Sequence, residues 1–394
     1  MVEFQNASRL KRIAIEEVDR LRDELIDLSL RIHANPELAF EEYKAVEWLT
    51  GALEARGFRV ERGSCDLATA FRASFGRGNG PRIALLAEYD ALAKLGHACG
   101  HNIMGTASVG AAIAVSKVMS NLDGEVLVIG TPAEEGGGGK AIMIERAAFA
   151  DIDAAMIVHP GTKTRVVTRA LASATIEVEF RGKSAHAASR PEDGVNALDA
   201  MILSYNNINA LRQHIRRDAR IHGIITSGGE APNIVPSYAS GRFFVRAEDD
   251  LYLDGLLEKV LDCFRGGEKA SGARLTYHMP EARYAPLRNN MALAEAFGAN
   301  LRELGVAVQP EDPNRASGST DMGNVSQVVP AIHPSIGIAE ETISTHSPEF
   351  ATAAISESGH HGLLNAAKAL AMTTIDLLTN AKLLAQMKEE FARK

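Results

Sequence analysis

Short runs of apolar residues alternate with segments of helical periodicity along the first 170 residues of the chain. Unbroken runs of Ala, Val, Ile and Leu are typical of strands that are buried on both faces. Three such runs predict strands over 83–87, 124–130 and 154–158. Apolar residues at helical spacing predict helices over 8–33, 40–56 and 103–119. This alternation predicts an α/β fold in which helices pack against a sheet with parallel strands.

The hydrophobic pattern changes near residue 171. From there, polar and apolar residues alternate as in antiparallel strands that expose one face. The alternation predicts strands over 173–180, 221–226, 237–247 and 274–278, together with two helices, the first from about Ala187 to Arg217. After Asn290 the helical periodicity resumes, with a strand predicted over 331–338 and a long helix over 359–378. We therefore expect a domain made of 1–170 and 285–394, interrupted by a compact α+β domain of 171–284.

Residues with metal-binding side chains follow each of the three buried strands. Cys99 and His101 come after the first strand, Glu134 and Glu135 after the second, and His159 directly after the third. The carboxyl ends of parallel strands are where ligands bind in open α/β sheets, so these side chains are expected to lie together. Thiolate, imidazole and carboxylate groups are ligands of zinc and similar ions. The sequence therefore predicts a metal site at this edge of the sheet.

Each of these residues also has an ordinary structural explanation when it is considered alone. Cys99 could be a buried side chain beside a surface histidine, and Glu134 and Glu135 could lie in a solvated loop. Cys99 could also be a nucleophile with His101 as its base, although residues so close in sequence rarely align for that chemistry. The recurrence of such groups at three successive strand ends favours the metal site.

Two other catalytic motifs are excluded by spacing. No G-x-S-x-G occurs in the sequence, so the nucleophile elbow of a serine hydrolase is not supported. Four glycines, Gly136–Gly139, precede Lys140, but Ala141 occupies the position of the hydroxyl residue and the phosphate-loop spacing is missing.

Asp90 and His346 complete a candidate site with enough ligands for two metal ions close together. Such a pair of ions can bind a bridging water, lower its pKa and polarise a carbonyl group. A free carboxylate beside them can take the proton of the water and pass it to a leaving nitrogen. Amide hydrolysis needs both functions: activation of the water and the carbonyl group, and transfer of a proton to the leaving nitrogen.

The bulk composition of the chain bears on its partners and its compartment. The 394 residues carry a net charge of −8 without a basic run, so no nucleic-acid partner is expected. The N-terminus lacks the apolar core of a signal peptide, and the apolar segment 103–119 is expected to pack inside the protein rather than in a membrane. Three widely spaced cysteines give no disulfide framework. A cytoplasmic protein is therefore expected.

Several motifs of the chain resemble one family of enzymes. HACGH, PAEEG, GKSAHAA and APNIVP, together with His159 and His346, are similar to the metal-dependent family of aminoacylases, hippurate hydrolases and indole-acetyl-amino-acid hydrolases. The motifs occur in family order over nearly the whole chain. GHACGHN and GSTDMGNVS resemble more closely one branch, that of the p-aminobenzoyl-glutamate hydrolase B subunit and the aminoacylase-1-like dipeptidases that act on β-alanyl-lysine.

The resemblance implies a di-metal aminopeptidase-like catalytic domain, with a mixed sheet between helices, that holds two divalent ions. The ions would be zinc or manganese, with cobalt as a further alternative. The family's ligands fall on Cys99, His101, Glu135, His159 and His346. Its general base falls on Glu134, and the Asp that orients a ligand falls on Asp90.

One position departs from the family pattern. Many relatives have Asp where this chain has Asn102. An amide is a weaker acceptor than a carboxylate behind a metal ligand, so metal affinity or metal choice is expected to differ.

The resemblance also implies that the smaller domain is a lid through which the protein forms a homodimer. His186 of the GKSAH motif would enter the partner's active site and donate to the substrate carbonyl oxygen. Alternatively, His186 caps the helix expected to begin near Ala187. Substrate binding is assigned to Asn233, Arg246, Ser319 and Thr320. Arg246 could equally be a surface charge on a strand.

These observations predict a hydrolase that cleaves the amide bond of N-acyl amino acids or small dipeptides. Two alternatives stay open. The chain could be a component that needs a partner, as the resemblance to the p-aminobenzoyl-glutamate hydrolase allows, or a non-catalytic relative that only binds a ligand. The second alternative would be expected to have lost Glu134 or a ligand, and the sequence retains both.

Overall fold

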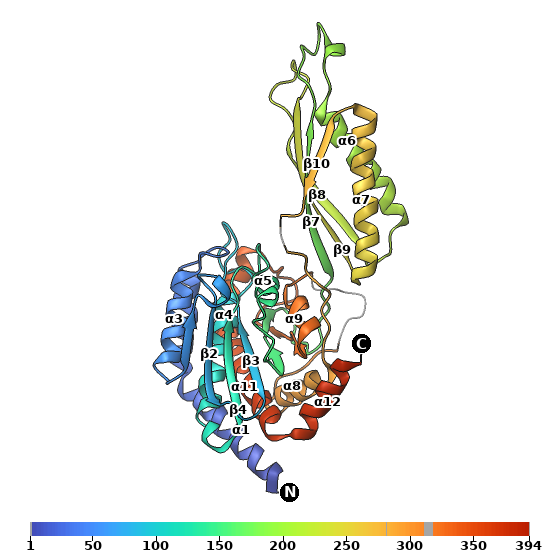
Figure 1. Cartoon of the computed structure of the whole chain (residues 1–394). Coiled ribbons are helices and arrows are strands. Elements are labelled where there is room, and N and C mark those ends of the chain that lie inside the picture. The colour runs from blue at the N-terminus through green and yellow to red at the C-terminus, as the bar shows by residue number, and fades with distance from the viewer. Residues whose placement is uncertain (1, 281, 311–317, 394) are drawn as a thin grey trace. The chain divides into compact units, whose positions relative to one another are not determined.

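The computed structural model describes residues 2–280, 282–310 and 318–393 (Figure 1). The chain divides into two compact units. Unit 1 comprises Met1–Arg169, Leu287–Ser317 and Asp321–Lys394, and unit 2 comprises Ala170–Pro286 and Gly318–Thr320. Separate clusters of buried apolar residues form the cores of the two units.

Unit 1 contains a six-stranded mixed sheet in the order β1-β2-β4-β3-β5-β11. The strands are β1 (Arg59–Arg62), β2 (Phe71–Arg77), β3 (Arg82–Ala87), β4 (Gly124–Gly130), β5 (Ala154–Met156) and β11 (Ala331–Ile332). β3 runs parallel to β4 and β5, and β11 runs parallel to β5. β2 is antiparallel to both of its neighbours. The predicted α/β fold with a mixed sheet is confirmed, and the carboxyl ends of β3, β4 and β5 lie along one edge.

Helices pack on both faces of this sheet (Figure 1). The unit 1 helices are α1 (Val2–Arg20), α2 (Arg22–Ala34), α3 (Tyr43–Glu54), α4 (His101–Ser116), α5 (Gly139–Glu145), α8 (Met291–Glu303), α9 (Met322–Val328), α10 (Pro348–Ala353), α11 (Glu357–Thr379) and α12 (Ala381–Ala392). Successive residues of a strand point to opposite faces. Leu85 of β3 accordingly shares a core with α4 and α11, whereas Leu86 shares the other core with Met143 of α5 and Met322 of α9.

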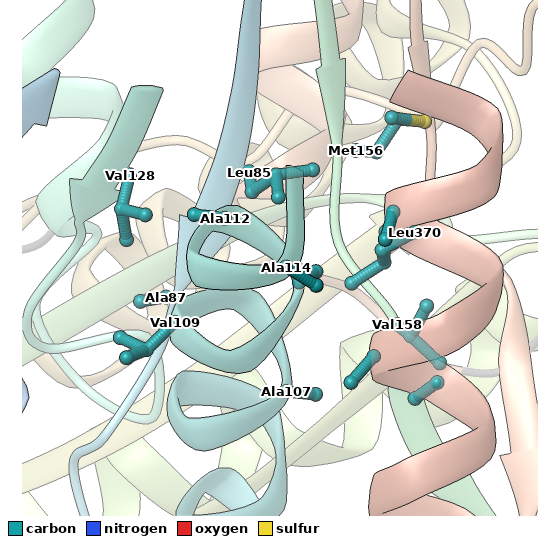
Figure 2. Packing of buried hydrophobic residues seen from close by; sticks show 14 of the residues in the cluster. Leu85, Ala87, Ala107, Val109, Ala112, Ala114, Val128, Met156, Val158 and Leu370 are labelled. Carbon is teal, nitrogen blue, oxygen red and sulfur yellow. The ribbon is translucent and has the colours of Figure 1, made fainter. Parts of the chain in front are cut away.

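Small residues allow α4 to lie in the interior of unit 1. Residues 101–115 of this helix are all buried. A Cβ on Gly110 would lie 2.8 Å from a methyl carbon of Leu25, so a larger residue there would force the Leu25 side chain of α2 to move. Figure 2 shows alanines of α4 beside Leu85 and beside Leu370 of α11. The prediction of a closely packed internal helix is confirmed.

Three element boundaries differ from the sequence-based expectation. The helix expected over 8–33 is broken at Leu21 into α1 and α2. The strand expected over 154–158 ends early, as β5, and a separate strand, β6 (His159–Gly161), follows it. The strand expected over 331–338 is divided into β11 and β12 (Ser335–Gly337). β6 and β12 pair with each other in a separate parallel ladder. Pro334, which has no N–H to donate, lies between β11 and β12 and interrupts the strand.

Unit 2 is an α+β unit with an antiparallel sheet in the order β10-β7-β9-β8. Its elements are β7 (Ala172–Arg181), α6 (Ala197–Leu211), β8 (Arg220–Ser227), β9 (Tyr238–Ala247), α7 (Asp250–Ser271) and β10 (Arg274–His278). The alternating burial of β9 matches the predicted half-exposed strand. The two predicted helices are present, but no helix begins at Ala187. Pro191 and Gly194 interrupt the segment, and α6 starts only where the Asn196 side chain accepts the N–H of Asp199.

No helix in the described part of the chain combines the length and the apolar character needed to cross a membrane.

Candidate metal centre and active site

A tight turn before α4 places Cys99 and His101 at the carboxyl edge of the sheet. Gly100, between them, has a left-handed backbone with φ of +84°. A Cβ at this position would also lie 2.8 Å from Cγ of Pro160, so the turn requires glycine. Because Pro160 follows His159, the same close approach brings the thiol to the third strand end. Sγ of Cys99 lies 3.2 Å from Nε2 of His159.

The five expected ligands form two groups that share one thiol. Ligand atoms of Cys99, His101 and His159 lie within 4.8 Å of one another, as do those of Cys99, Glu135 and His346. His346 comes from the loop before α10, and its backbone N–H donates to the carbonyl oxygen of Ala98. Nε2 of His346 lies 3.5 Å from Oε1 of Glu135. The structure therefore brings all five side chains together.

His101 and His159 each engage Nδ1 with a neighbouring oxygen atom. Nδ1 of His101 lies 2.9 Å from Oδ1 of Asp90, and Nδ1 of His159 lies 2.5 Å from the carbonyl oxygen of Pro160. These acceptors assign the proton to Nδ1 in each ring and leave the lone pair on Nε2. Asp90 also accepts the N–H of Glu135 through Oδ2 at 2.9 Å. Asp90 thus orients residues of both ligand groups, as carboxylates behind metal ligands do.

The chemical state of these side chains fits divalent cations. Nε2 of His101 and Oε1 of Glu135 are buried and have no hydrogen-bond partner among the described residues. Burial lowers the pKa of His159 to about 4, so this ring is neutral and can donate its lone pair near pH 7. Burial raises the pKa of the Cys99 thiol well above its usual range, and a bound cation is what would keep it a thiolate. Two ions with Cys99 between them would satisfy all five ligands.

Glu134 lies beside these groups on the loop after β4. Ligand atoms of Glu88, His101 and Glu134 also lie within 4.8 Å of one another. Burial, and secondarily the negative charge of Glu88, raises the pKa of Glu134 well above that of a free carboxyl group. The preceding residue, Ala133, has a φ of +60°, and its N–H donates to the buried carboxylate of Glu42 at 2.8 Å. The loop that carries Glu134 is therefore held in a conformation that residues other than glycine rarely adopt.

Comparison with known proteins identifies the family. The sequence pattern of the peptidase family M20/M25/M40 matches residues 89–359. The chain belongs to this family. The chain is also 39% identical to the Xaa-Arg dipeptidase of Mus musculus, over 97% of this chain and 92% of that protein. It is 33% identical to the B subunit of the p-aminobenzoyl-glutamate hydrolase of Escherichia coli (strain K12), over 95% of this chain and 92% of that protein.

The fold has a close counterpart among solved structures. The YxeP protein of Bacillus subtilis, described as a dinuclear metal binding peptidase from the M20 family, superposes with a TM-score of 0.69 at 19% identity. The match covers 91% of this chain and 99% of that one. Together with the family match and the two relatives, it agrees with the expected fold. This M20/M25/M40 peptidase is a metal-dependent hydrolase.

Sequence reasoning missed a group of charged and aromatic side chains behind the ligands of this peptidase. Nζ of Lys140 lies 2.6 Å from Oε1 of Glu88 and 2.7 Å from Oδ1 of Asp321, and all three side chains are buried. His333 packs edge-to-face on His159 with ring centroids 5.4 Å apart. A signal for Glu88 and Lys140 was present, since Glu88 ends an apolar strand and Lys140 follows the glycine run.

Asn102 has a packing contact rather than a contact with a ligand. It is fully buried in the first turn of α4, and its Nδ2 donates to Oγ of Ser29 in α2 at 2.9 Å. Its Oδ1 has no hydrogen-bond partner in the part of the chain that the structure describes. The amide therefore connects two helices, and the structure gives no support for a direct effect on a ligand.

The remaining expected site residues of the M20/M25/M40 peptidase belong to unit 2. His186 is exposed, and it lies beside Asn233 because Ala187 N–H donates to the Asn233 carbonyl oxygen at 3.0 Å. Nδ1 of His186 accepts from backbone N–H groups that follow it, at 3.3 Å. With no helix at Ala187, the interpretation of His186 as a helix cap is wrong.

Arg246 lies on β9 and its side chain is half-buried, so it is not a simple surface charge. One guanidinium nitrogen donates to Oγ of Ser319 at 3.3 Å, and the group lies over the ring of Phe244. Ser319 and the buried Thr320 come from the short segment that joins unit 2. Unit 2 thus holds two pairs of expected site residues: His186, the expected catalytic donor, with Asn233, and Arg246 with Ser319.

Proposed function

We propose that this chain hydrolyses the amide bond of small dipeptides and N-acyl amino acids at a two-ion centre, with Glu134 as the general base. The observation that carries this proposal is the sharing of Cys99 between two ligand groups, with Glu134 beside them. Ions bound there would polarise the amide carbonyl and lower the pKa of a water. Three histidines, one thiolate and one carboxylate supply the ligands.

Glu134 supplies the proton transfer in this proposal. Its carboxylate takes a proton from the attacking water and delivers it to the leaving nitrogen. The raised pKa moves Glu134 toward the proton affinity that a general base needs near neutral pH. Asp90 keeps the proton of His101 on Nδ1 and thereby holds the ring in its ligating orientation.

Zinc is the ion that we propose first, with cobalt and manganese as alternatives. A thiolate and imidazole nitrogens are ligands that zinc prefers, whereas manganese favours oxygen. Elemental analysis of the purified protein decides between them. Fewer than two ions per chain in an active preparation would contradict the two-ion centre.

Dipeptides are the substrate class that we favour within this proposal. The mouse relative named Xaa-Arg dipeptidase is more similar to this chain than the Escherichia coli hydrolase is. Arg246 and Ser319 offer a guanidinium and a hydroxyl group, which suit the carboxylate of a C-terminal amino acid. We therefore assign Arg246, Ser319, Thr320 and Asn233 to substrate binding.

A homodimer formed through unit 2 is part of the proposal. β8 is an edge strand of the unit 2 sheet, and its residues Ile224 and Ile225 are exposed. An exposed apolar edge strand favours pairing with another strand, here the same strand of a second copy. In such a dimer the exposed His186 would act in the partner's active site, where it donates to the carbonyl oxygen of the substrate.

A reducing compartment such as the cytoplasm suits the site. All three cysteines are free thiols, and Cys99 must stay reduced to bind a cation.

One assay tests the substrate class. The chain is purified alone and loaded with zinc, cobalt or manganese, then given dipeptides ending in Arg or Lys, N-acyl amino acids and p-aminobenzoyl-glutamate. We expect turnover of dipeptides by the chain alone. Activity only after addition of a second protein would favour the partner-dependent alternative, and binding without turnover would favour a non-catalytic relative.

A further inference from the structure

The carboxylate of Glu42 is turned away from the helix that it precedes. Glu42 is the N-cap residue of α3, a position from which a side chain often accepts an N–H of its own helix, but it makes no such bond. Glu37 supplies that cap instead, because its carboxylate accepts the N–H groups of Lys44 and Ala45 at 2.9 and 3.0 Å. The buried side chain of Glu42 is therefore left for a contact outside its own helix.

That contact is with the loop that carries Glu134. Oε1 of Glu42 accepts the N–H of Ala133, 91 residues further along the chain, at 2.8 Å. The same short segment also packs on the loop through Phe40, since a Cβ on Gly137 would lie 2.4 Å from an atom of the Phe40 ring. The segment 40–42 thus contacts the loop at two points, one polar and one apolar.

Three successive peptide groups around Glu134 are each held by a hydrogen bond. These bonds are those of Ala133 N–H to Glu42 at 2.8 Å, of Gly138 N–H to the carbonyl oxygen of Ala133 at 2.9 Å, and of Glu135 N–H to Asp90 at 2.9 Å. Because peptide groups are planar, the orientations of three successive groups determine φ and ψ of the two residues between them. These bonds therefore fix the direction in which the Glu134 side chain leaves the backbone.

The backbone at Ala133 needs such support. Its φ of +60° lies in the left-handed region, which is unfavourable for a residue with a Cβ. Ala133 is also fully buried, so without Glu42 its N–H would have neither water nor another acceptor in place of the carboxylate. Loss of this acceptor would favour a different backbone conformation directly before Glu134.

We propose that Glu42 is a positioning residue for the general base, which holds the backbone turn that directs the carboxylate of Glu134 to the metal centre. A carboxylate oxygen of Glu134 lies within 4.8 Å of a ring nitrogen of His101 in this conformation. Asp90 holds the other side of the turn through Glu135, so the ligand is expected to stay in place when Glu42 is changed. The inference rests on the proposed function, because it assigns Glu42 to the base named there.

Two substitutions of Glu42 separate its acceptor oxygen from its bulk and charge. Glu42→Met keeps the length of the side chain and removes the acceptor, whereas Glu42→Gln keeps an oxygen that can accept the N–H of Ala133. We expect Glu42→Met to retain both ions and an unchanged KM while kcat falls about tenfold or more, because a small misplacement of a catalytic group is costly. Glu42→Gln is expected to keep a kcat close to that of the unchanged protein.

Glu42→Asp serves where Glu42→Met does not fold. Its carboxylate is one methylene shorter and no longer reaches the N–H of Ala133. Its kcat is expected to lie below that of Glu42→Gln.

Hydrogen exchange of the metal-free protein reports on the turn without reference to catalysis. The backbone N–H groups of residues 133–138 are expected to exchange faster in Glu42→Met than in the unchanged protein, because the turn opens more often. Glu42→Gln should keep the protection of the unchanged protein.

A double substitution shows whether Glu42 acts through Glu134. If it does, Glu42→Met combined with Glu134→Gln should be no slower than Glu134→Gln alone, since there is no base left to misplace. A further loss equal to that of Glu42→Met by itself would mean that Glu42 acts independently of the base, which would overturn the proposal.

Glu125→Met is the matched control. Glu125 is another buried glutamate, at the opposite end of β4 from the loop, where it pairs with Arg59 and Arg82 at 3.0 and 2.9 Å. Its loss is expected to lower stability and to leave kcat and the exchange of residues 133–138 unchanged.

Three results would overturn the role of Glu42. These are an unchanged kcat in Glu42→Met, an equal loss of kcat in Glu42→Gln, or a loss of ions in proportion to activity. Near-normal turnover of Glu134→Gln would instead overturn the base assigned in the proposed function, and it is measured without any change at Glu42.

Discussion

His101 and Asp90 are joined by a buried hydrogen bond of 2.9 Å between Nδ1 and a carboxylate oxygen. Asp90→Ala removes the acceptor that orients the ring and frees the N–H of Glu135 as well. Loss of such a carboxylate behind a ligand typically weakens metal binding by about 10–100-fold. Competition with a chelator measures the affinity. Asp153→Ala, at a distant ion pair with Lys388, is the control and should keep the affinity of the unchanged protein.

Removal of the metal is expected to abolish activity reversibly. Dialysis against a chelator should remove about two ions per chain, and zinc or cobalt should restore turnover, because the fold of unit 1 itself brings both ligand groups together. Elemental analysis and the dipeptide assay are followed in parallel. Full activity in protein shown to be metal-free would contradict this prediction.

Substitutions of the adjacent acids Glu134 and Glu135 are expected to have different effects on metal content and turnover. Glu134→Gln should keep both ions and lower kcat by about 10²-fold or more, since it removes proton transfer. Glu135→Gln should lower metal content, because its Oε1 faces His346 in one ligand group. Metal content and kcat of the two variants are compared directly. Near-normal turnover of Glu134→Gln would show that another group is the base.

Mixed dimers test the proposed action of His186 in the partner's site. One chain carries His186→Ala and the other Glu134→Gln, and the heterodimer is isolated after co-expression. If His186 acts across the dimer, one site has both defects and the other has neither, so up to about half of the unchanged activity should return. An inactive heterodimer, or a monomer by light scattering, would contradict the proposed action of His186 across the dimer. Neither result would contradict the proposed metal centre.

Glu42 is expected to make folding stability depend on pH. Burial raises its pKa to about 7 from an ordinary value near 4.5. The folded state binds this proton more tightly than the unfolded state, so the contribution of Glu42 to stability is fully present below about pH 4.5 and is lost as the pH rises through about 7. The contribution is on the order of 3 kcal/mol. Denaturant unfolding from pH 5 to 8 should show a smaller pH slope for Glu42→Gln than for the unchanged chain, measured under identical metal conditions.

Hydrophobic periodicity was sufficient to predict the buried strands, because runs such as 124–130 are apolar on both faces. Periodicity could not place the break at Leu21, which depends on how α1 and α2 pack. The break at Pro334 comes from the missing N–H of a proline, which hydrophobic periodicity does not take into account. Nor could periodicity predict that the α-helix expected near Ala187 begins only at Ala197, after a short 3-10 helix over Pro191–Asp193. There the turn residues Pro191 and Gly194 override a helical composition.

The ligand residues were predictable because most of them directly follow buried strands, and these strands can be recognised in the sequence. Their partners were not, because Lys140 and Asp321 are 181 residues apart and meet only in the folded chain. The same applies to Asn102, whose contact with Ser29 spans 73 residues. A single charged residue in an apolar run, such as Glu88, is a signal of burial, but its counter-ion is fixed by the tertiary structure.

The insertion of unit 2 gives the metal centre an order of assembly during synthesis. Cys99, His101 and His159 all precede unit 2, so the chain emerging from the ribosome carries one complete ligand group before unit 2 is made. The other group needs His346, which follows unit 2, and the sheet gains β11 only at the same late stage. Because β6, which carries His159, pairs with β12 from the part of the chain after unit 2, even the first ligand group reaches its folded position only after that part has been made.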